Sequence, residues 1–319
     1  MTVPEYDICQ EDGVSNMKYI DIFGKKVSAI GCGCMRIAGF DEKKTEEYIR
    51  TALDLGINFF DHADIYGGGH CEELFGEFLK KNPEYREKMF IQSKCGIRKG
   101  WFDFSYEHIM ESVDGILERL HTDHLDSLLL HRPDVLMEPE EVDKAFSELK
   151  ESGKVRHFGV SNMNRFQMEY LGNNIDEKLF ADQLQMSIVH TPLIDAGLNV
   201  NMGNDPSIMR DAGTLEYLRD HERVLQVWSP LQIGYFEGTF LNSERYEKLN
   251  GTLEQMAEKY GVGKDAIAYA WLLRLPMKVQ VVLGTANIEH IASAVKACDI
   301  TLEKKDWYTL YLDAGNRLP

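Results

Sequence analysis

The chain has 319 residues, of which 44% are hydrophobic and 27% are charged, and these are the proportions of an ordinary globular protein. They exclude disordered, collagen-like and disulfide-scaffold proteins. Acidic residues outnumber basic residues by 52 to 35, which gives a net charge of −17. Such a surface repels nucleic acid and anionic lipid, and no basic patch offsets it, so we expect neither as a partner.

Residues 1–17 are expected to form an extension ahead of the fold. The segment 1–15 carries Glu5, Asp7, Glu11 and Asp12 and has no apolar core, so it is not a signal peptide. The longest apolar runs are far shorter than a membrane span. The six cysteines contain no CxxC motif, and without an export signal we expect reduced thiols and a cytoplasmic protein.

Short apolar runs alternate with amphipathic stretches along most of the chain. In one such stretch Val142, Ala145 and Leu149 share a helical face, with Pro139 near its start and Gly153 past its end. The runs are too short for helices and too uniformly apolar for half-exposed strands, which indicates a parallel sheet covered on both faces. Eight strands alternating with helices predict a (β/α)8 TIM barrel, with a doubly wound sheet as the alternative. The runs are 28–30, 57–60, 89–93, 127–130, 157–160, 179–184, 224–227 and 279–283.

Two elements fall outside this alternation. Residues 19–22 and 25–27, joined by Phe23-Gly24, predict a β-hairpin before the first barrel strand. Residues 304–313 predict an extra C-terminal helix capped by Thr301. No Pro/Gly/Ser-rich linker divides the chain, so we expect a single barrel domain spanning residues 1–319.

Polar side chains follow several of the predicted strands where each strand ends. Asp61, Lys94 and His131 come at the ends of the second, third and fourth apolar runs. Because the carboxyl ends of barrel strands share one face, these side chains are expected to converge. Tyr66 lies five residues past Asp61, in a loop that can fold back over the same face.

These residue types suit proton transfer to a carbonyl oxygen. Asp61 and Lys94 are expected to form a buried pair, because either charge alone is costly to bury. We expect the Lys94 ammonium to lower the pKa of Tyr66 and make it a general acid. A neutral His131 can orient the carbonyl through a ring N–H.

At these residues the chain resembles the aldo-keto reductases, of the bacterial type. The resemblance runs from Tyr19 to about Ala297. Its motifs are GINFFDHADIYG at 56–67, SK at 93–94, LHRP at 130–133, GKVR at 153–156, GVSN at 159–162 and WSPL at 228–231. It implies a (β/α)8 barrel, a catalytic tetrad of Asp61, Tyr66, Lys94 and His131, and reduction of a small aldehyde or ketone by NADPH or NADH.

The same resemblance implies a set of cofactor contacts. Ser161, Asn162 and Gln183 would hold the nicotinamide carboxamide, and Trp228 would stack on the ring. The remaining implied contacts are Gly33, Cys34, Met35, Asp61, Ser229, Pro230, Leu231, Leu283, Gly284, Thr285 and His290. NADPH is the expected cofactor, more than NADH, although the loop 284–290 contains no lysine and has His290 where relatives often carry arginine. No metal is expected.

Other interpretations of the same residues stay open at this point. The chain could be a nicotinamide-binding sensor or regulatory subunit with little turnover, or an aldolase that uses Lys94 as a Schiff-base amine. Cys95 could be a reactive thiol or an inert buried one. Trp101-Phe102 and Tyr235-Phe236 could line a substrate pocket or only pack their loops. We expect a monomer or a weak homo-oligomer.

Overall fold

The computed structural model describes residues 7–8 and 17–318, and the expected extension at 1–17 lies almost wholly outside the described residues. Eight parallel strands close into a barrel in the order β10–β11–β12–β13–β4–β5–β6–β9. This is the predicted TIM barrel, and it excludes the doubly wound sheet. The barrel strands are β4 (Ile30–Gly33), β5 (Phe59–Asp61), β6 (Phe90–Cys95), β9 (Leu125–Leu130), β10 (Val155–Ser161), β11 (Leu179–Gln185), β12 (Val224–Trp228) and β13 (Val279–Leu283).

Each of the eight apolar runs contributes to a barrel strand, with one shift at the first. The run 28–30 predicts a strand that the structure places at Ile30–Gly33. The shift arises because β3 (Lys25–Ser28) pairs antiparallel with β2 (Lys18–Ile22) as a hairpin, which takes Ser28 out of the barrel. The hairpin itself is confirmed, and the short β1 (Asp7–Ile8) pairs with its outer side.

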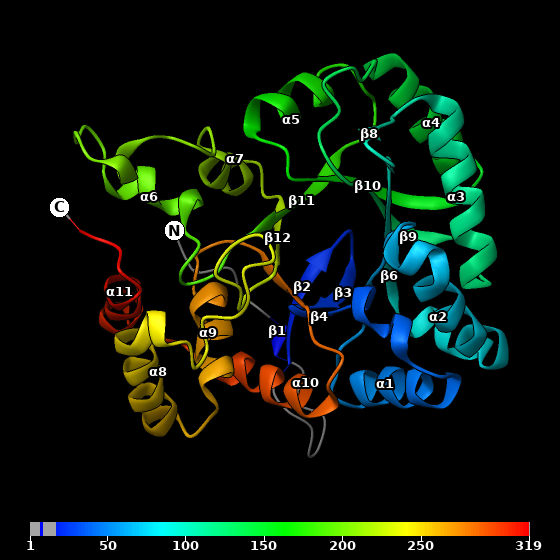
Figure 1. The fold of residues 1–319 in the computed structure, drawn as a ribbon. Helices are drawn as coiled ribbons and strands as arrows, with labels where there is room; N and C mark the ends of the chain where they lie inside the picture. Colours follow the sequence, from blue (N-terminus) through cyan, green and yellow to red (C-terminus); the bar gives the residue numbers. More distant parts are fainter. Residues whose placement is uncertain (1–6, 9–16, 319) are drawn as a thin grey trace. The chain divides into compact units, whose positions relative to one another are not determined.

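The chain divides into two compact units, each described by itself. The first unit comprises Gly31–Gln183 with Gly284–Ala286, and the second comprises Leu184–Leu283 with the described parts of the two terminal regions. In the first unit α1, α2, α3 and α4 pack against one another in chain order, and they succeed one another from blue to green in Figure 1. The helices are α1 (Glu42–Asp54), α2 (His70–Lys81), α3 (Tyr106–Leu120), α4 (Pro139–Glu151) and α5 (Arg165–Gly172).

Helix starts in the first unit follow ordinary capping chemistry. Asp41 accepts a hydrogen bond from the Lys44 amide at the start of α1, and the predicted cap Ser105 accepts one from the His108 amide at the start of α3. Pro139 occupies the first turn of α4, where its missing N–H costs nothing. These residues fix where the loops before α1, α3 and α4 end.

In the second unit helices contact β12 and β13 and pack against one another. The helices of this unit are α6 (Pro192–Leu198), α7 (Thr214–Asp220), α8 (Glu247–Tyr260), α9 (Lys264–Leu273), α10 (Ile288–Val295) and α11 (Lys304–Asp313). The last of these is the predicted C-terminal helix with the predicted bounds. The predicted cap is wrong, because Glu303 precedes the helix and no side chain caps it. The helix is held instead by stacking of Trp307 on Trp271, with 4.6 Å between ring centroids.

Strand packing in the first unit brings backbones into close contact. A side chain on Gly31 would place its Cβ 2.2 Å from the Phe59 ring, so only glycine lets β4 lie against β5 here. At the amino ends of β6 and β9 a buried ion pair joins Arg86 to Asp126, with 2.9 Å between nitrogen and oxygen. The same carboxylate accepts a hydrogen bond from the Ile91 amide. The amino ends of these two strands are thereby fixed to one another.

Within the described part of the chain, no helix is long and apolar enough to cross a lipid bilayer. Cys32, Cys34, Cys71, Cys95 and Cys298 are buried free thiols, and Cys9 lies outside the described residues.

Candidate active site

Asp61 and Lys94 form a buried ion pair at the carboxyl ends of two adjacent strands. Asp61 ends β5 and Lys94 lies in β6, and these strands pair in parallel. The Lys94 side chain is 0% exposed and that of Asp61 is 3% exposed, and Nζ lies 2.7 Å from Oδ2. Burial alone would lower the pKa of Lys94, but the Asp61 carboxylate and Tyr66 outweigh burial and leave that pKa raised. Lys94 is therefore an ammonium at neutral pH.

The Lys94 ammonium uses all three of its N–H groups. It donates to Asp61 Oδ2 at 2.7 Å, to the His62 carbonyl oxygen at 2.8 Å and to Tyr66 Oη at 3.3 Å. An ammonium has no lone pair and can only donate. The Tyr66 oxygen therefore accepts in this contact, and the phenol proton remains for another acceptor.

Tyr66 lies in the turn η2 (Tyr66–Gly69), which follows β5 and folds back over its end. Burial raises the pKa of the Tyr66 phenol, and the Lys94 ammonium opposes that rise without cancelling it. The expectation that Lys94 makes this phenol more acidic than a free tyrosine is therefore wrong in its net sign. The physical reason is that a phenolate loses its hydration here and faces the Asp61 carboxylate. Tyr66 stays protonated at neutral pH.

His131 lies directly after β9 and faces Tyr66. Its backbone N–H donates to the Cys95 carbonyl at 3.0 Å, and its ring centroid lies 6.0 Å from that of Tyr66 in an edge-to-face arrangement. Burial and the nearby Lys94 lower the pKa of His131 well below its usual value. The neutral ring that the sequence predicts is thus favoured. Among the described residues, its Nδ1 has no hydrogen-bond partner.

Two side-chain amides donate to the second carboxylate oxygen of Asp61, a role that the sequence did not indicate. Gln92 Nε2 donates to Asp61 Oδ1 at 2.7 Å and Gln183 Nε2 donates to it at 3.1 Å. Ser127 in turn donates to Gln92 Oε1 at 3.0 Å. Gln92 stands two residues before Lys94, on the same face of β6, and that spacing is the signal that could have found it.

Ser161, Asn162 and Gln183 gather near the ends of β10 and β11. Ser161 donates to the Gln183 carbonyl at 2.9 Å, and Asn162 Nδ2 donates to Ser161 Oγ at 2.7 Å. Asn162 adopts a left-handed backbone with φ of 61°, which turns the chain sharply at the strand end. Through Gln183 this polar cluster connects to Asp61. Its hydroxyl and amide groups match a carboxamide in donors and acceptors.

Other predicted cofactor residues lie at strand ends of the first unit. Gly33 ends β4, and Cys34 and Met35 begin the turn η1 (Cys34–Gly39), with Cys34 buried and Met35 exposed. Gly284 and Thr285 also belong to this unit, and a Cβ on Gly284 would meet no atom within 4 Å. The open backbone at Gly284 suits the close approach of a ligand.

The remaining predicted cofactor residues belong to the second unit. Trp228 is the half-buried last residue of β12, and Ser229 follows with a φ of 51°. Pro230 and Leu231 continue that loop, Leu283 ends β13, and His290 lies in the first turn of α10. Their contact with a cofactor stays a prediction.

The structure also bears on the competing interpretations. Burial raises the pKa of Cys95 well above its usual value, which favours the inert thiol. Residues 97–102 form a small hairpin after β6, on which Trp101 and Phe102 are exposed. Among the described residues, no three His, Cys, Asp or Glu side chains gather as metal ligands.

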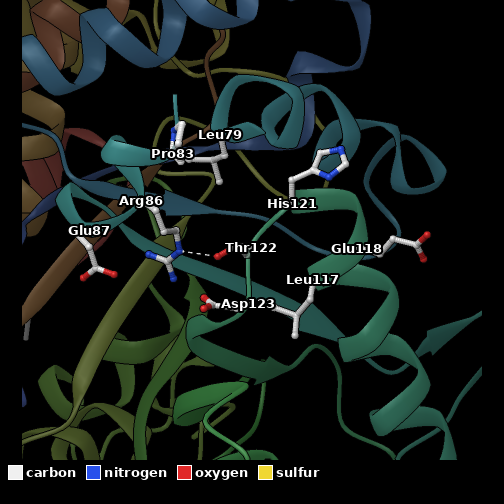
Figure 2. Close-up of a pocket in the computed structure, with 9 residues that line it drawn as sticks. All are labelled: Leu79, Pro83, Arg86, Glu87, Leu117, Glu118, His121, Thr122 and Asp123. Carbon is white, nitrogen blue, oxygen red and sulfur yellow. Dashed lines mark hydrogen bonds between the residues drawn. The ribbon is translucent and has the colours of Figure 1, made fainter. Parts of the chain in front are cut away.

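A hollow of about 700 Å³ lies elsewhere in the first unit, between the carboxyl ends of α2 and α3 (Figure 2). Its walls include Arg86, Thr122 and Asp123, which lie at the amino ends of β6 and β9, whereas the tetrad lies at the carboxyl ends. The Arg86 guanidinium donates to Thr122 Oγ1 at 2.9 Å and pairs with Asp126. That cation is therefore engaged within the fold, at the opposite ends of the strands from the tetrad.

The chain belongs to the aldo/keto reductase family, whose model matches residues 29–311. It is 38% identical over 272 residues to the oxidoreductase YdhF of Escherichia coli, covering 82% of this chain and 85% of that protein. It is 36% identical over 273 residues to a 6-dehydroglucose reductase of Agrobacterium fabrum, with the same coverage. A crystal structure of an aldo-keto reductase from Klebsiella pneumoniae in complex with NADPH has the same fold, with a TM-score of 0.72 and 23% identity over 90% of this chain and 91% of that chain.

Proposed function

We propose that the protein is an NADPH-dependent reductase that converts an aldehyde or ketone to an alcohol, with Tyr66 as the proton donor. The proposal rests on the hydrogen bonds that the Lys94 ammonium donates. Its three N–H groups go to Asp61, the His62 carbonyl and Tyr66 Oη, so the Tyr66 proton is available to a substrate. The family supports the same chemistry.

The donors and acceptors at the ends of β10 and β11 fit a nicotinamide. Ser161, Asn162 and Gln183 would hold its carboxamide. When bound, the reduced nicotinamide supplies the hydride that the carbonyl carbon accepts. NADPH is proposed over NADH because an enzyme of the same fold was crystallised with NADPH. The absence of lysine from residues 284–290 makes this preference a matter for measurement.

Each member of the tetrad has one task in the proton transfer. Tyr66, kept protonated by its raised pKa, gives its proton to the carbonyl oxygen as the carbon gains the hydride. The Lys94 ammonium stabilises the phenolate that remains, and Asp61 keeps Lys94 charged. The neutral His131 donates a hydrogen bond to the carbonyl oxygen and orients it.

The geometry of Lys94 disfavours the aldolase alternative. A Schiff-base lysine must be neutral and reachable, whereas Lys94 is 0% exposed and its pKa is raised. Borohydride in the presence of aldehydes should therefore leave Lys94 unmodified. A stable reduced adduct on Lys94 would favour the aldolase.

Steady-state oxidation of NADPH with a panel of carbonyl compounds tests the proposal. The panel should contain aromatic aldehydes, short aliphatic aldehydes and oxidised hexoses, the last because a relative is named for reducing 6-dehydroglucose. We expect many turnovers per protein molecule with at least one class, and a lower Kd for NADPH than for NADH. A single slow turnover with every compound would favour the nicotinamide-binding sensor instead.

A further inference from the structure

Glu72 is a buried carboxylate whose two oxygens are both partnered. It lies in the first turn of α2 and is 0% exposed. Its Oε1 accepts a hydrogen bond from Ser93 Oγ at 2.6 Å, and its Oε2 accepts from Arg119 Nε and Nη2, each at 2.8 Å. A carboxylate withdrawn from water is tolerated when it is fully hydrogen-bonded in this way. Glu72 therefore links α2 to β6 and to α3.

The link joins the two chain segments that carry the Tyr66–Lys94 contact. Glu72 follows Tyr66 by six residues, through the turn η2 and the start of α2, and Ser93 directly precedes Lys94. The contact itself, at 3.3 Å between Nζ and Oη, is at the long end of hydrogen-bond distances. A small displacement of either segment would break it. We propose that Glu72, acting through Ser93, is a positioning residue that sets the distance between Tyr66 and Lys94.

Glycines leave the room that the Arg119 side chain needs to reach Glu72. A Cβ on Gly69 would lie 2.9 Å from Arg119 Cδ, and a Cβ on Gly115 would lie 3.0 Å from Arg119 Nη1. Gly69 also has a φ of 97°, which disfavours any side chain at the residue that joins the Tyr66 turn to α2. Gly69 thus serves both the turn that carries Tyr66 and the space that the Arg119 side chain occupies.

The Arg86–Asp126 pair provides a matched comparison within the same unit. It is also buried, and it also joins β6 to a neighbouring element, through the Ile91 amide. It lies at the amino ends of the strands, away from Tyr66 and Lys94. A link that serves only the fold should behave like this pair, whereas a positioning link should change catalysis out of proportion to stability.

The inference rests on the proposed reductase function, and the variant Ser93→Ala tests it with little risk to folding. We expect kcat to fall about 10- to 100-fold, since a displacement of the order of 1 Å has that effect on a reacting group. The Kd for NADPH should stay within about twofold, and the solvent deuterium isotope effect on kcat should rise as proton transfer slows. Ser93→Thr, which restores the hydroxyl, should recover most of kcat. Asp126→Asn should lower the thermal midpoint and leave kcat and the isotope effect unchanged.

A readout that needs no turnover separates this inference from the reductase proposal. With tyrosines labelled in the ring, the Tyr66 resonance is the one absent from Tyr66→Phe. We expect it to shift in Ser93→Ala and not in Asp126→Asn. An unmoved Tyr66 resonance together with wild-type kcat in Ser93→Ala would overturn the positioning role. The positioning role would also be overturned if Asp126→Asn lowered kcat as much as Ser93→Ala does when the two variants are equally stable. A shifted resonance in a protein that reduces no carbonyl compound would support the positioning role and count against the reductase.

Discussion

Replacement of Asp61 by asparagine should expose the cost of an unpaired Lys94. The substitution keeps the side-chain shape and removes the countercharge 2.7 Å from a fully buried ammonium. Breaking a buried ion pair in this way destabilises a protein by about 3 to 5 kcal/mol. Lys94 can instead release its proton on folding. For a lysine whose unperturbed pKa is 10.5, that release costs about 5 kcal/mol at pH 7, at about 1.4 kcal/mol per pH unit. An unpaired ammonium and a deprotonated Lys94 would therefore lower the stability by about the same amount.

The pH dependence distinguishes this explanation from ordinary loss of packing. In the wild type the folded-state pKa of Lys94 is raised, so its stabilising effect is complete below pH 10.5 and does not vary between pH 7 and pH 9. In Asp61→Asn burial is left without a counterion, so that pKa falls and the unfolded chain binds one more proton than the folded chain. The stability of the variant should then rise with pH, by up to about 2.7 kcal/mol between pH 7 and pH 9.

Urea unfolding followed by circular dichroism at pH 7, 8 and 9 measures this difference. Asp126→Asn is the matched control, because it removes the carboxylate from a buried arginine that does not lose its proton in this range. The difference in unfolding free energy between Asp126→Asn and the wild type should be constant with pH. For Asp61→Asn this difference should become smaller as the pH rises from 7 to 9. A deficit for Asp61→Asn that is equally constant would refute the assignment of Lys94 as a buried cation held charged by Asp61.

Three further predictions follow from the site and the fold. Because the pKa of His131 is lowered, His131 should contribute no inflection to kcat between pH 6 and pH 7.5, and His131→Gln should lower kcat without changing the shape of the profile. An inflection that His131→Gln removes would contradict a neutral ring. Asn162→Gly keeps the backbone with φ of 61° and removes the side-chain amide. The Kd for NADPH, measured by fluorescence quenching, should then rise about 5- to 10-fold, which corresponds to the loss of one hydrogen bond. An unchanged Kd would remove Asn162 from the cofactor site. Trp307→Ala removes the ring stacked on Trp271 and should cost about 3 kcal/mol in thermal unfolding, whereas an unaltered melting curve would show that α11 is held by other contacts.

The barrel was predictable because its strands are buried on both faces. That burial makes the runs largely apolar, and some of them end in a polar residue such as Asp61 or His131. Apolarity alone does not mark where one strand stops and another begins. The boundary between β3 and β4 at Ala29 was therefore missed.

The parts of the site that sequence could not supply depend on distances across the fold. The net sign of the Tyr66 pKa shift follows from how deeply the phenol is buried, which no spacing reveals. The contact between Glu72 and Arg119 joins residues 47 apart in sequence on two different helices. Only the packing of α2 against α3 brings these residues together.

The most direct test of the account compares Tyr66→Phe with the wild type in two assays, with Tyr106→Phe as the control. Tyr106 lies on α3, where its hydroxyl donates to Glu148 at 2.6 Å, and its loss should change neither assay. For Tyr66→Phe we expect NADPH binding within about twofold of the wild type and kcat lower by about 10²- to 10⁴-fold, the usual contribution of a general acid. Undiminished turnover in Tyr66→Phe would mean that another group delivers the proton.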